Sequence, residues 1–350
     1  MTPLIGNTRA FAAVQRALAS ASPPHAWLFV GPEGLGEAAL ARWLAQAMNC
    51  QEQGTRNKEQ GTEPCGQCPQ CDRIARGIHA DVLTVAIPPA DEGPQHKEIS
   101  VDQIREVQRA VALAPFEGRT RVVIIDPADK LSEEAQNAFL KTLEEPPPNA
   151  MFVLIATRGD SLLPTVRSRC ALIEFGLVAM GEIEQALRQG GVDEERARLL
   201  ARLSNGRPDW ALAMADDASR LEKRGEALEQ ARALAAMPMG DLMDLGERLA
   251  QQFRRDREAV LERLDGWLSW WRDVLLLSAS GESEDGVANV DMLDALREDA
   301  GRYDQDGVVA FVQALRECRR RLEGNVQARI ALDALLVRAP GAGSLHTTKT

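Results

Sequence analysis

Aromatic side chains are scarce in this sequence, at 4% of 350 residues, and Tyr303 is the single tyrosine. Proteins that stack single-stranded bases need rows of exposed aromatic rings, so this scarcity argues against such a platform. Positive charge is also in deficit, since 41 Lys and Arg stand against 52 Asp and Glu, a net charge of −11. Because DNA affinity depends on Lys and Arg that neutralise phosphates, the balance argues against a chain that holds DNA alone.

Long hydrophobic runs are absent as well. No stretch of about 18 uncharged apolar residues occurs, which excludes a membrane-spanning helix. The first residues, Met1–Gly6, lack a basic segment followed by an apolar one, so they do not form a signal peptide. We therefore expect a cytoplasmic protein with no membrane partner.

The first half of the chain alternates strand-like and helix-like segments. Hydrophobic residues make up 45% of the sequence, which is ordinary for a globular protein. Helical periodicity begins near Glu37, Ser100 and Ser132, and the last of these helices ends near Glu145 before three prolines. Continuous apolar strands separated by helices predict an α/β domain with a parallel sheet covered on both faces, over residues 1–176. The predicted strands are Trp27–Val30, Val122–Ile125, Met151–Ile155 and Leu172–Phe175.

Strand signals stop after residue 177, so the rest is predicted to be helical. We expect a small helical domain over 177–236, a larger one over 240–338 and a disordered tail over 339–350. Trp267, Trp270 and Trp271 follow helical spacing and are interpreted as core residues. A four-residue repeat within 51–63, Glu-Gln-Gly-Thr, has no apolar face and is interpreted as a flexible loop.

A glycine-rich segment follows the first predicted strand and opens a helix, which is the context of a phosphate-binding loop. Gly31, Gly34 and Gly36 supply the turn, and the spacing of the first and last matches the G-x-x-x-x-G-K-[ST] pattern. The two positions that carry the chemistry differ, because Glu37 replaces the lysine and Ala38 replaces the hydroxyl. A carboxylate beside a polyanion turns an attraction into a repulsion. The alternative is an incidental glycine-rich turn.

Asp126 directly follows the predicted strand Val122–Ile125. Nucleotide-hydrolysing proteins carry a metal-coordinating aspartate at the end of such a strand. ATPases follow this residue with a glutamate that activates water, but here Pro127 follows. Asp126 could also be a turn residue only. Together with the altered loop, this pattern predicts a degenerate nucleotide site that does not hydrolyse ATP.

Four of six cysteines lie close together in the sequence, within 50–71. Cys65, Cys68 and Cys71 form C-x₂-C-x₂-C, and Cys50 lies upstream. Four thiolates suit tetrahedral Zn²⁺ in a structural site, with an iron–sulfur cluster as the alternative. Cys50 is the less certain ligand because the repeat separates it from the others. His79 could substitute for it, although a core histidine is the commoner case.

Three further segments resemble bacterial DNA polymerase III clamp-loader subunits: Asn137–Pro147, Ala156–Thr157 and Leu162–Cys170. The cysteine cluster is also similar to that of this family. The resemblance implies a RecA-like AAA+ module, a helical lid over 177–236 and a helical collar over 240–338 that serves oligomerisation. It also implies gamma/tau and delta subunits as partners, and a sliding clamp and primed DNA reached through the complex.

Particular residues acquire roles through this resemblance. Ser168, Arg169 and Cys170 match the SRC motif, whose arginine reaches the ATP site of the neighbouring subunit as a trans arginine finger. The alternative for Arg169 is a surface arginine. Thr157 matches the sensor-1 position. In the lid, Asp209 stands where ATP-hydrolysing relatives carry an arginine.

The lost residues imply the delta prime branch of this family, without intrinsic ATPase and without tightly bound ATP. Two alternatives remain open at this point. One is an ATP-hydrolysing subunit of the gamma/tau type, against which the missing charge and metal ligands argue. The other is a stand-alone zinc-dependent nucleic-acid-binding protein, against which the net charge argues.

Overall fold

The computed structural model describes residues 4–52, 63–87, 98–280, 286–324 and 327–341. The chain divides into two compact units. One contains the chain up to Gly191 together with Gly206–Trp210, and the other contains Val192–Asn205 and everything from Ala211 onward. The predicted domain boundaries near residues 176, 236 and 338 divide the chain more finely and stay a prediction. Most of the repeat over 51–63 and of the tail over 339–350 lies outside the described residues.

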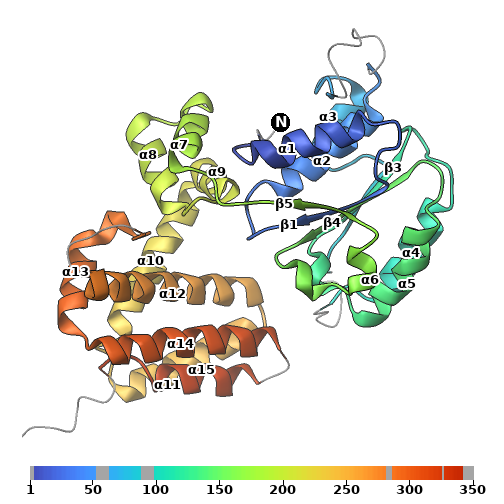
Figure 1. Ribbon diagram of the computed structural model, residues 1–350. Coiled ribbons are helices and arrows are strands. Elements are labelled where there is room, and N and C mark those ends of the chain that lie inside the picture. Colours follow the sequence, from blue (N-terminus) through green and yellow to red (C-terminus); the bar gives the residue numbers. More distant parts are fainter. Residues whose placement is uncertain (1–3, 53–62, 88–97, 281–285, 325–326, 342–350) are drawn as a thin grey trace, which may run out of the picture. The chain divides into compact units, whose positions relative to one another are not determined.

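The first unit is built on a five-stranded parallel sheet, with strand order β2-β3-β4-β1-β5 (Figure 1). In the central register, Leu28 of β1 pairs with Leu154 of β4 on one side and with Leu172 of β5 on the other. The sheet confirms the predicted fold class and the four predicted strands, and it adds one strand. The strands are β1 (Ala26–Val30), β2 (Val82–Val85), β3 (Arg121–Ile125), β4 (Ala150–Ala156) and β5 (Ala171–Glu174).

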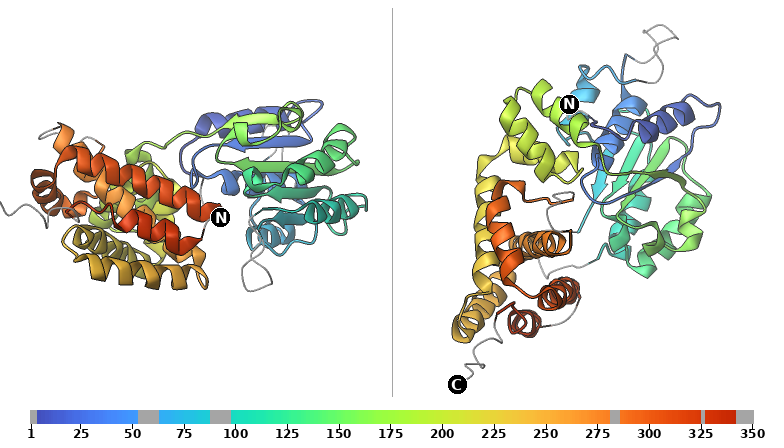
Figure 2. Two further views of the ribbon diagram at one scale, coloured as in Figure 1. Left: turned by 90° about the horizontal axis from the view of Figure 1, so that it is seen from below. Right: turned by 60° about the vertical axis from the view of Figure 1, so that its left-hand side comes forward.

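Helices cover both faces of this sheet (Figures 1 and 2). Trp27 and Phe29 of β1 point to the face covered by α1, α2 and α3, whereas Leu28 points to the face of α4, α5 and α6. Both faces are apolar, which explains why the strands are continuous rather than alternating apolar runs. The helices of this unit are α1 (Thr8–Leu18), α2 (Glu37–Asn49), α3 (Pro69–Ala75), α4 (Val101–Val111), α5 (Glu133–Glu144), α6 (Pro164–Arg167) and α7 (Met180–Gln189).

Two predicted helix starts are confirmed by their caps. The Ser100 Oγ accepts from the N–H of Gln103 at 3.4 Å, and the Gln103 side chain accepts from the Ser100 N–H at 3.0 Å. These reciprocal bonds satisfy two N–H groups that the first turn of α4 leaves unpaired. The Ser132 Oγ accepts from the N–H of Ala135 at 3.2 Å and opens α5. Ser132 thus fixes where α5 begins.

The second unit is helical, and its core surrounds α12. Trp267, Trp270 and Trp271 are completely buried there. The indole N–H of Trp270 donates to Asp299 at 3.1 Å, and the tryptophans form core, as expected, rather than a binding surface. Helix α9 begins in the first unit and ends in the second. The helices are α8 (Glu194–Leu203), α9 (Pro208–Asp216), α10 (Ala218–Leu234), α11 (Met239–Phe253), α12 (Arg257–Ser280), α13 (Leu293–Arg302), α14 (Gln305–Glu323) and α15 (Ala328–Leu336).

Among the described residues, no helix combines the length and the apolar character needed to cross a bilayer.

Candidate functional site

Three segments predicted to carry chemistry meet at the carboxyl edge of the sheet. The glycine-rich loop follows β1, Asp126 follows β3 and Thr157 follows β4. The carboxyl ends of parallel strands share one edge, and this edge is where open α/β sheets bind ligands. Topology therefore brings together residues that are more than 120 positions apart in the sequence.

The loop between β1 and α2 depends on its glycines. Gly34 and Gly36 have φ angles of 88° and 98°, which other residues rarely adopt. A Cβ at Gly31 would lie 2.8 Å from the Cβ of Phe175 and 2.9 Å from its carbonyl oxygen, so a larger residue does not fit without rearrangement. The strand–loop–helix geometry of a phosphate-binding loop is thus retained, and an incidental turn is a weaker interpretation.

Glu37 folds back onto this loop instead of leaving it open. Its side chain is buried, with 4% of the residue exposed, and its Oε2 accepts from the N–H of Leu35 at 3.0 Å. The other carboxylate oxygen, Oε1, has no hydrogen-bond partner within the described part of the chain. A loop N–H of the kind that binds phosphate in active enzymes is therefore taken by the chain's own carboxylate.

Two further carboxylates add negative charge to the same place. Burial raises the pKa of Glu37 to about 7, and the neighbouring Asp209 and Asp126 contribute to the rise. Burial also raises the pKa of Asp126 and of Asp209. The N–H of Asp209 donates to the Gly34 carbonyl at 3.1 Å, so the segment after α8 is tied to the loop. The electrostatics of the site oppose a bound triphosphate.

Thr157 is less integrated than the other predicted residues. Its N–H donates to a carboxylate oxygen of Asp129 at 3.2 Å, and its side chain is exposed. The structure gives it no hydrogen bond to Glu37 or to the glycine loop in the described residues. The sensor role implied for Thr157 by the resemblance stays a prediction.

Arg169 lies at the end of the turn that follows α6. Its Nη1 donates to the carbonyl of Thr165 at 2.8 Å and to the Oγ of Ser168 at 3.3 Å. Its Nη2 donates to Oε1 of Glu144, at the end of α5, at 2.6 Å. The side chain remains 34% exposed, so the guanidinium is held in place and is still accessible. Sequence reasoning missed Glu144, although it lies in the quoted segment Asn137–Pro147.

Cys170 follows this arginine in the sequence and is partly buried. Its side chain contacts the core between the sheet and α4, α5 and α6. Burial raises the pKa of the Cys170 thiol to about 12, so it stays protonated at neutral pH. A buried, protonated thiol differs from a reactive thiolate, and the role implied for Cys170 by the resemblance stays a prediction.

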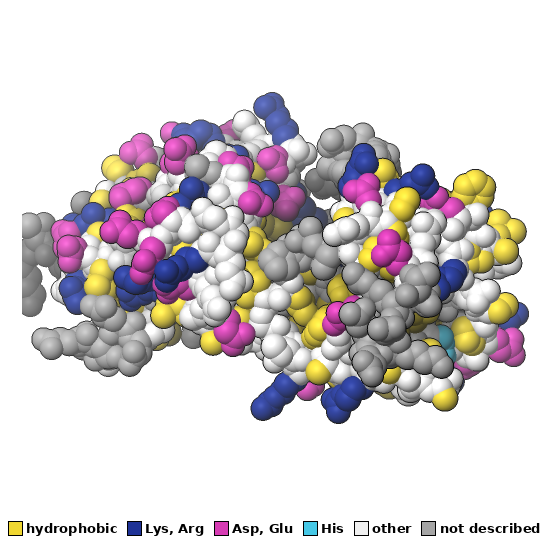
Figure 3. Space-filling view, turned by 90° about the horizontal axis from the view of Figure 1, so that it is seen from above, with side chains coloured by type: hydrophobic (Ala, Val, Ile, Leu, Met, Phe, Trp, Pro, Cys, Tyr) yellow, Lys and Arg dark blue, Asp and Glu magenta, His cyan; other side chains and the backbone are white. Residues whose placement is uncertain are grey.

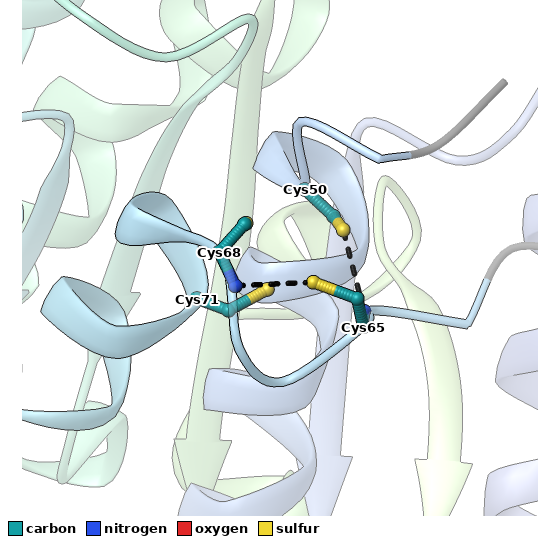
Figure 4. Close-up of side chains that lie close together, drawn as sticks. All are labelled: Cys50, Cys65, Cys68 and Cys71. Carbon is teal, nitrogen blue, oxygen red and sulfur yellow. Dashed lines mark hydrogen bonds between the residues drawn. The ribbon is translucent and has the colours of Figure 1, made fainter. Parts of the chain in front are cut away.

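The four clustered cysteines converge near the end of α2 and the start of α3 (Figure 4). The four sulfur atoms all lie within 4.8 Å of one another. The N–H of Cys65 donates to the Cys50 sulfur at 3.3 Å, and the N–H of Cys68 donates to the Cys65 sulfur at 3.2 Å. Such backbone hydrogen bonds orient sulfur ligands and stabilise negative charge on them. The structure thus brings Cys50 to the other three despite the intervening repeat.

The donor set fits a metal ion better than free thiols. Burial opposes ionisation of Cys68, but backbone N–H groups and neighbouring thiols outweigh it and lower its pKa to about 7. Burial raises the pKa of Cys71 far above its usual range, so a cation is needed for all four to ionise. His79 is not part of the cluster. It is buried, and its Nδ1 accepts from the N–H of Asp81 at 3.0 Å, so it is the core histidine.

Another buried carboxylate, that of Asp81, organises the loop between α4 and β3. Three successive N–H groups of Phe116, Glu117 and Gly118 donate to it at 2.8 Å each. Arg121 pairs with it at 2.7 Å, and the Asp81 side chain is completely buried. The loop that it fixes presents Phe116 at 84% exposure. Sequence reasoning missed this arrangement, because it joins residues 35 positions apart.

Known proteins similar to this chain match most of its length. A family model described as "DNA polymerase III, delta subunit" matches residues 6–178. The delta′ subunit of DNA polymerase III from Bacillus subtilis is 29% identical over 89% of this chain and 90% of its own length. The delta′ subunit from Pseudomonas aeruginosa is 28% identical over 91% of this chain and 93% of its own length. A gamma/tau subunit from Mycobacterium tuberculosis is 28% identical over 96% of this chain, but only 60% of its own length is covered. Among solved structures, a gamma subunit-related protein from Thermotoga maritima superposes with a TM-score of 0.43 at 18% identity, covering 94% of this chain and 97% of that one.

The parallel sheet and the glycine loop at its carboxyl edge define a RecA-like AAA+ module, followed by helices. Its phosphate-binding loop carries Glu37 and Ala38 in place of lysine and a hydroxyl residue. The chain belongs to the delta-prime family of DNA polymerase III clamp-loader subunits.

Proposed function

We propose that this clamp-loader subunit does not hydrolyse ATP itself and that Arg169 completes the ATP site of a neighbouring subunit. The contrast between two sites carries the proposal. The chain's own loop holds the buried carboxylate of Glu37, whereas Arg169 is intact, oriented and accessible. A planar guanidinium that is always charged suits a γ-phosphate, and an arginine supplied in trans accelerates phosphoryl transfer strongly.

The neighbours in this proposal are gamma/tau and delta subunits, and the sliding clamp and primed DNA are reached through the complex. The full-length matches to delta′ subunits and the match to gamma/tau subunits support these partners. The arrangement requires no tightly bound ATP in this chain. The cytoplasmic location expected from the sequence goes with this role and remains a prediction.

The four cysteines are proposed to bind Zn²⁺ in a structural role. Four sulfur ligands leave no open coordination position, so the ion would supply no catalysis. It would instead join the end of α2 to the start of α3, because Cys50 follows the former and Cys68 caps the latter. The mutual approach of the four sulfur atoms within 4.8 Å supports this assignment.

The deciding experiment substitutes Arg169 in a loader reconstituted from all its subunits. Arg169→Ala is expected to leave assembly intact and to lower DNA-stimulated ATPase at the affected site by at least about tenfold, because the transition-state charge loses its partner. Arg167→Ala is the matched control, since this arginine is exposed on α6 two residues away. ATPase that is unchanged by Arg169→Ala, or lowered equally by Arg167→Ala, would contradict the proposed role.

A further inference from the structure

The hydrogen bonds of Arg169 fall into two kinds. The acceptors of Nη1 are a backbone carbonyl and a hydroxyl from its own turn, Thr165 and Ser168. The acceptor of Nη2 is the charged Glu144, 25 positions away at the end of α5. A guanidinium has five N–H groups. Within the described residues, its Nε–H and one Nη2–H have no acceptor, so the edge that can bind an oxyanion in a fork is only partly used.

The ion pair between Arg169 and Glu144 is exposed to solvent. The Arg169 side chain is 34% exposed and the Glu144 side chain is 50% exposed. Exposed ion pairs of this kind contribute little stability, because water and salt screen them. A phosphate offers the same guanidinium more negative charge and a bidentate geometry. The pair therefore orients the arginine but is weak enough to be exchanged for a phosphate.

The two hydrogen bonds of Nη1 therefore have a different role from the hydrogen bond of Nη2. Thr165 and Ser168 lie in the same turn as Arg169 and fix the direction in which the side chain leaves the backbone. Glu144 supplies a carboxylate oxygen at 2.6 Å, which resembles a phosphate oxygen in charge and hydrogen-bonding geometry. A carboxylate at this position competes for the same donor that a nucleotide would use.

We propose that Glu144 is a positioning residue that occupies Arg169 in the free subunit and yields it to the γ-phosphate of the neighbour's ATP. The bonds to Thr165 and Ser168 persist during the exchange. Glu144 thereby keeps the arginine extended, and it also reduces the affinity of the intersubunit site for ATP. This inference rests on the proposed trans role of Arg169.

The test measures the ATPase of the reconstituted loader over a range of ATP concentrations. Glu144→Gln removes the competing charge, so we expect the apparent KM for ATP to fall about threefold, the size of effect that an exposed ion pair supports. The kcat is expected to change less than twofold, because Glu144 is absent from the transition state. Glu145→Gln is the matched control, since this exposed neighbour makes no contact with Arg169 among the described residues.

A second pair of loaders separates this inference from the function on which it rests. In an Arg169→Ala background, Glu144→Gln is expected to have no effect on KM, because the guanidinium for which Glu144 and the phosphate compete is missing. A KM that Glu144→Gln leaves unchanged, or lowers no more than Glu145→Gln does, overturns the inference while Arg169 keeps its role. A shift that persists without Arg169 overturns it as well. If Arg169→Ala leaves the ATPase of the reconstituted loader unchanged, the proposed function itself is overturned.

Discussion

Glu37 shows how one substitution converts a binding loop into a closed structural element. A lysine at this position would extend towards a bound nucleotide, whereas the carboxylate turns back and binds the Leu35 N–H. The cost is a buried charge beside Asp126 and Asp209, with one carboxylate oxygen left without a partner in the described residues. The sequence predicts the loss of the lysine, but not that the replacement fills the loop.

The raised pKa of Glu37 makes stability depend on pH. Between about pH 4.5 and 7, the folded chain holds a proton that the unfolded chain releases, so this group's contribution to stability falls as pH rises. Above pH 7 a constant penalty of about 3 kcal/mol remains, from the size of the pKa shift. Glu37→Gln keeps an acceptor for the Leu35 N–H and removes the charge. We therefore expect this variant to be more stable at pH 8 and nearly equal to the parent at pH 5, measured by urea unfolding.

Glu106→Gln provides the control for this experiment, because Glu106 is exposed on α4, which packs on the other face of the sheet from α2. It should leave the pH profile close to that of the parent chain. A Glu37→Gln profile parallel to the parent's across this range would show that Glu37 titrates in the folded chain as it does in the unfolded one.

Secondary structure can be predicted from the sequence where a segment is buried along its whole length and is therefore apolar throughout. Three of the four predicted strands are continuous apolar runs, and the fourth, β5, lies at a sheet edge with only Ile173 buried. The edge strand β2 escapes the same reasoning, since Val82–Val85 is short, contains Thr84 and is only partly buried. Contacts between side chains of two different elements are harder still to predict from the sequence. Asp81 and Glu144 take on their roles only when distant elements pack, and no local spacing marks either residue.

The cysteine cluster is the element whose prediction can be tested most directly. We expect the purified chain to contain about one zinc per molecule, because four sulfur ligands complete the coordination of a structural ion. Cys68→Ser should lose the metal and lower the thermal unfolding midpoint by roughly 5 °C or more, since metal binding contributes folding free energy. Metal analysis and thermal unfolding, each with and without a chelator, check both expectations.

Cys318→Ala is the matched control, since Cys318 is buried in the helical unit and outside the cluster. It should keep the full zinc content. Visible absorbance from an iron–sulfur cluster, or metal that survives Cys68→Ser, would contradict the zinc assignment.

Charge over the whole molecule separates a clamp-loader subunit from a protein that binds DNA alone. The net charge is −11, and on the face drawn in Figure 3 many Lys and Arg side chains lie among Asp and Glu side chains. Even the run Arg319–Arg321 has acidic partners, since Glu317 pairs with Arg320 and Arg321. Asp265 pairs with Arg319 at 2.9 Å. Arginines compensated in this way release few counterions from DNA.

We therefore expect the isolated chain not to retain primed DNA in filter binding, even at a low salt concentration of about 50 mM, where phosphate contacts are strongest. The reconstituted loader, with a clamp and ATP, should retain the same DNA and serves as the positive control. Retention by the isolated chain that weakens steeply with added salt would instead reveal a basic surface of its own. That result would favour a direct DNA-binding role over one exerted through the complex.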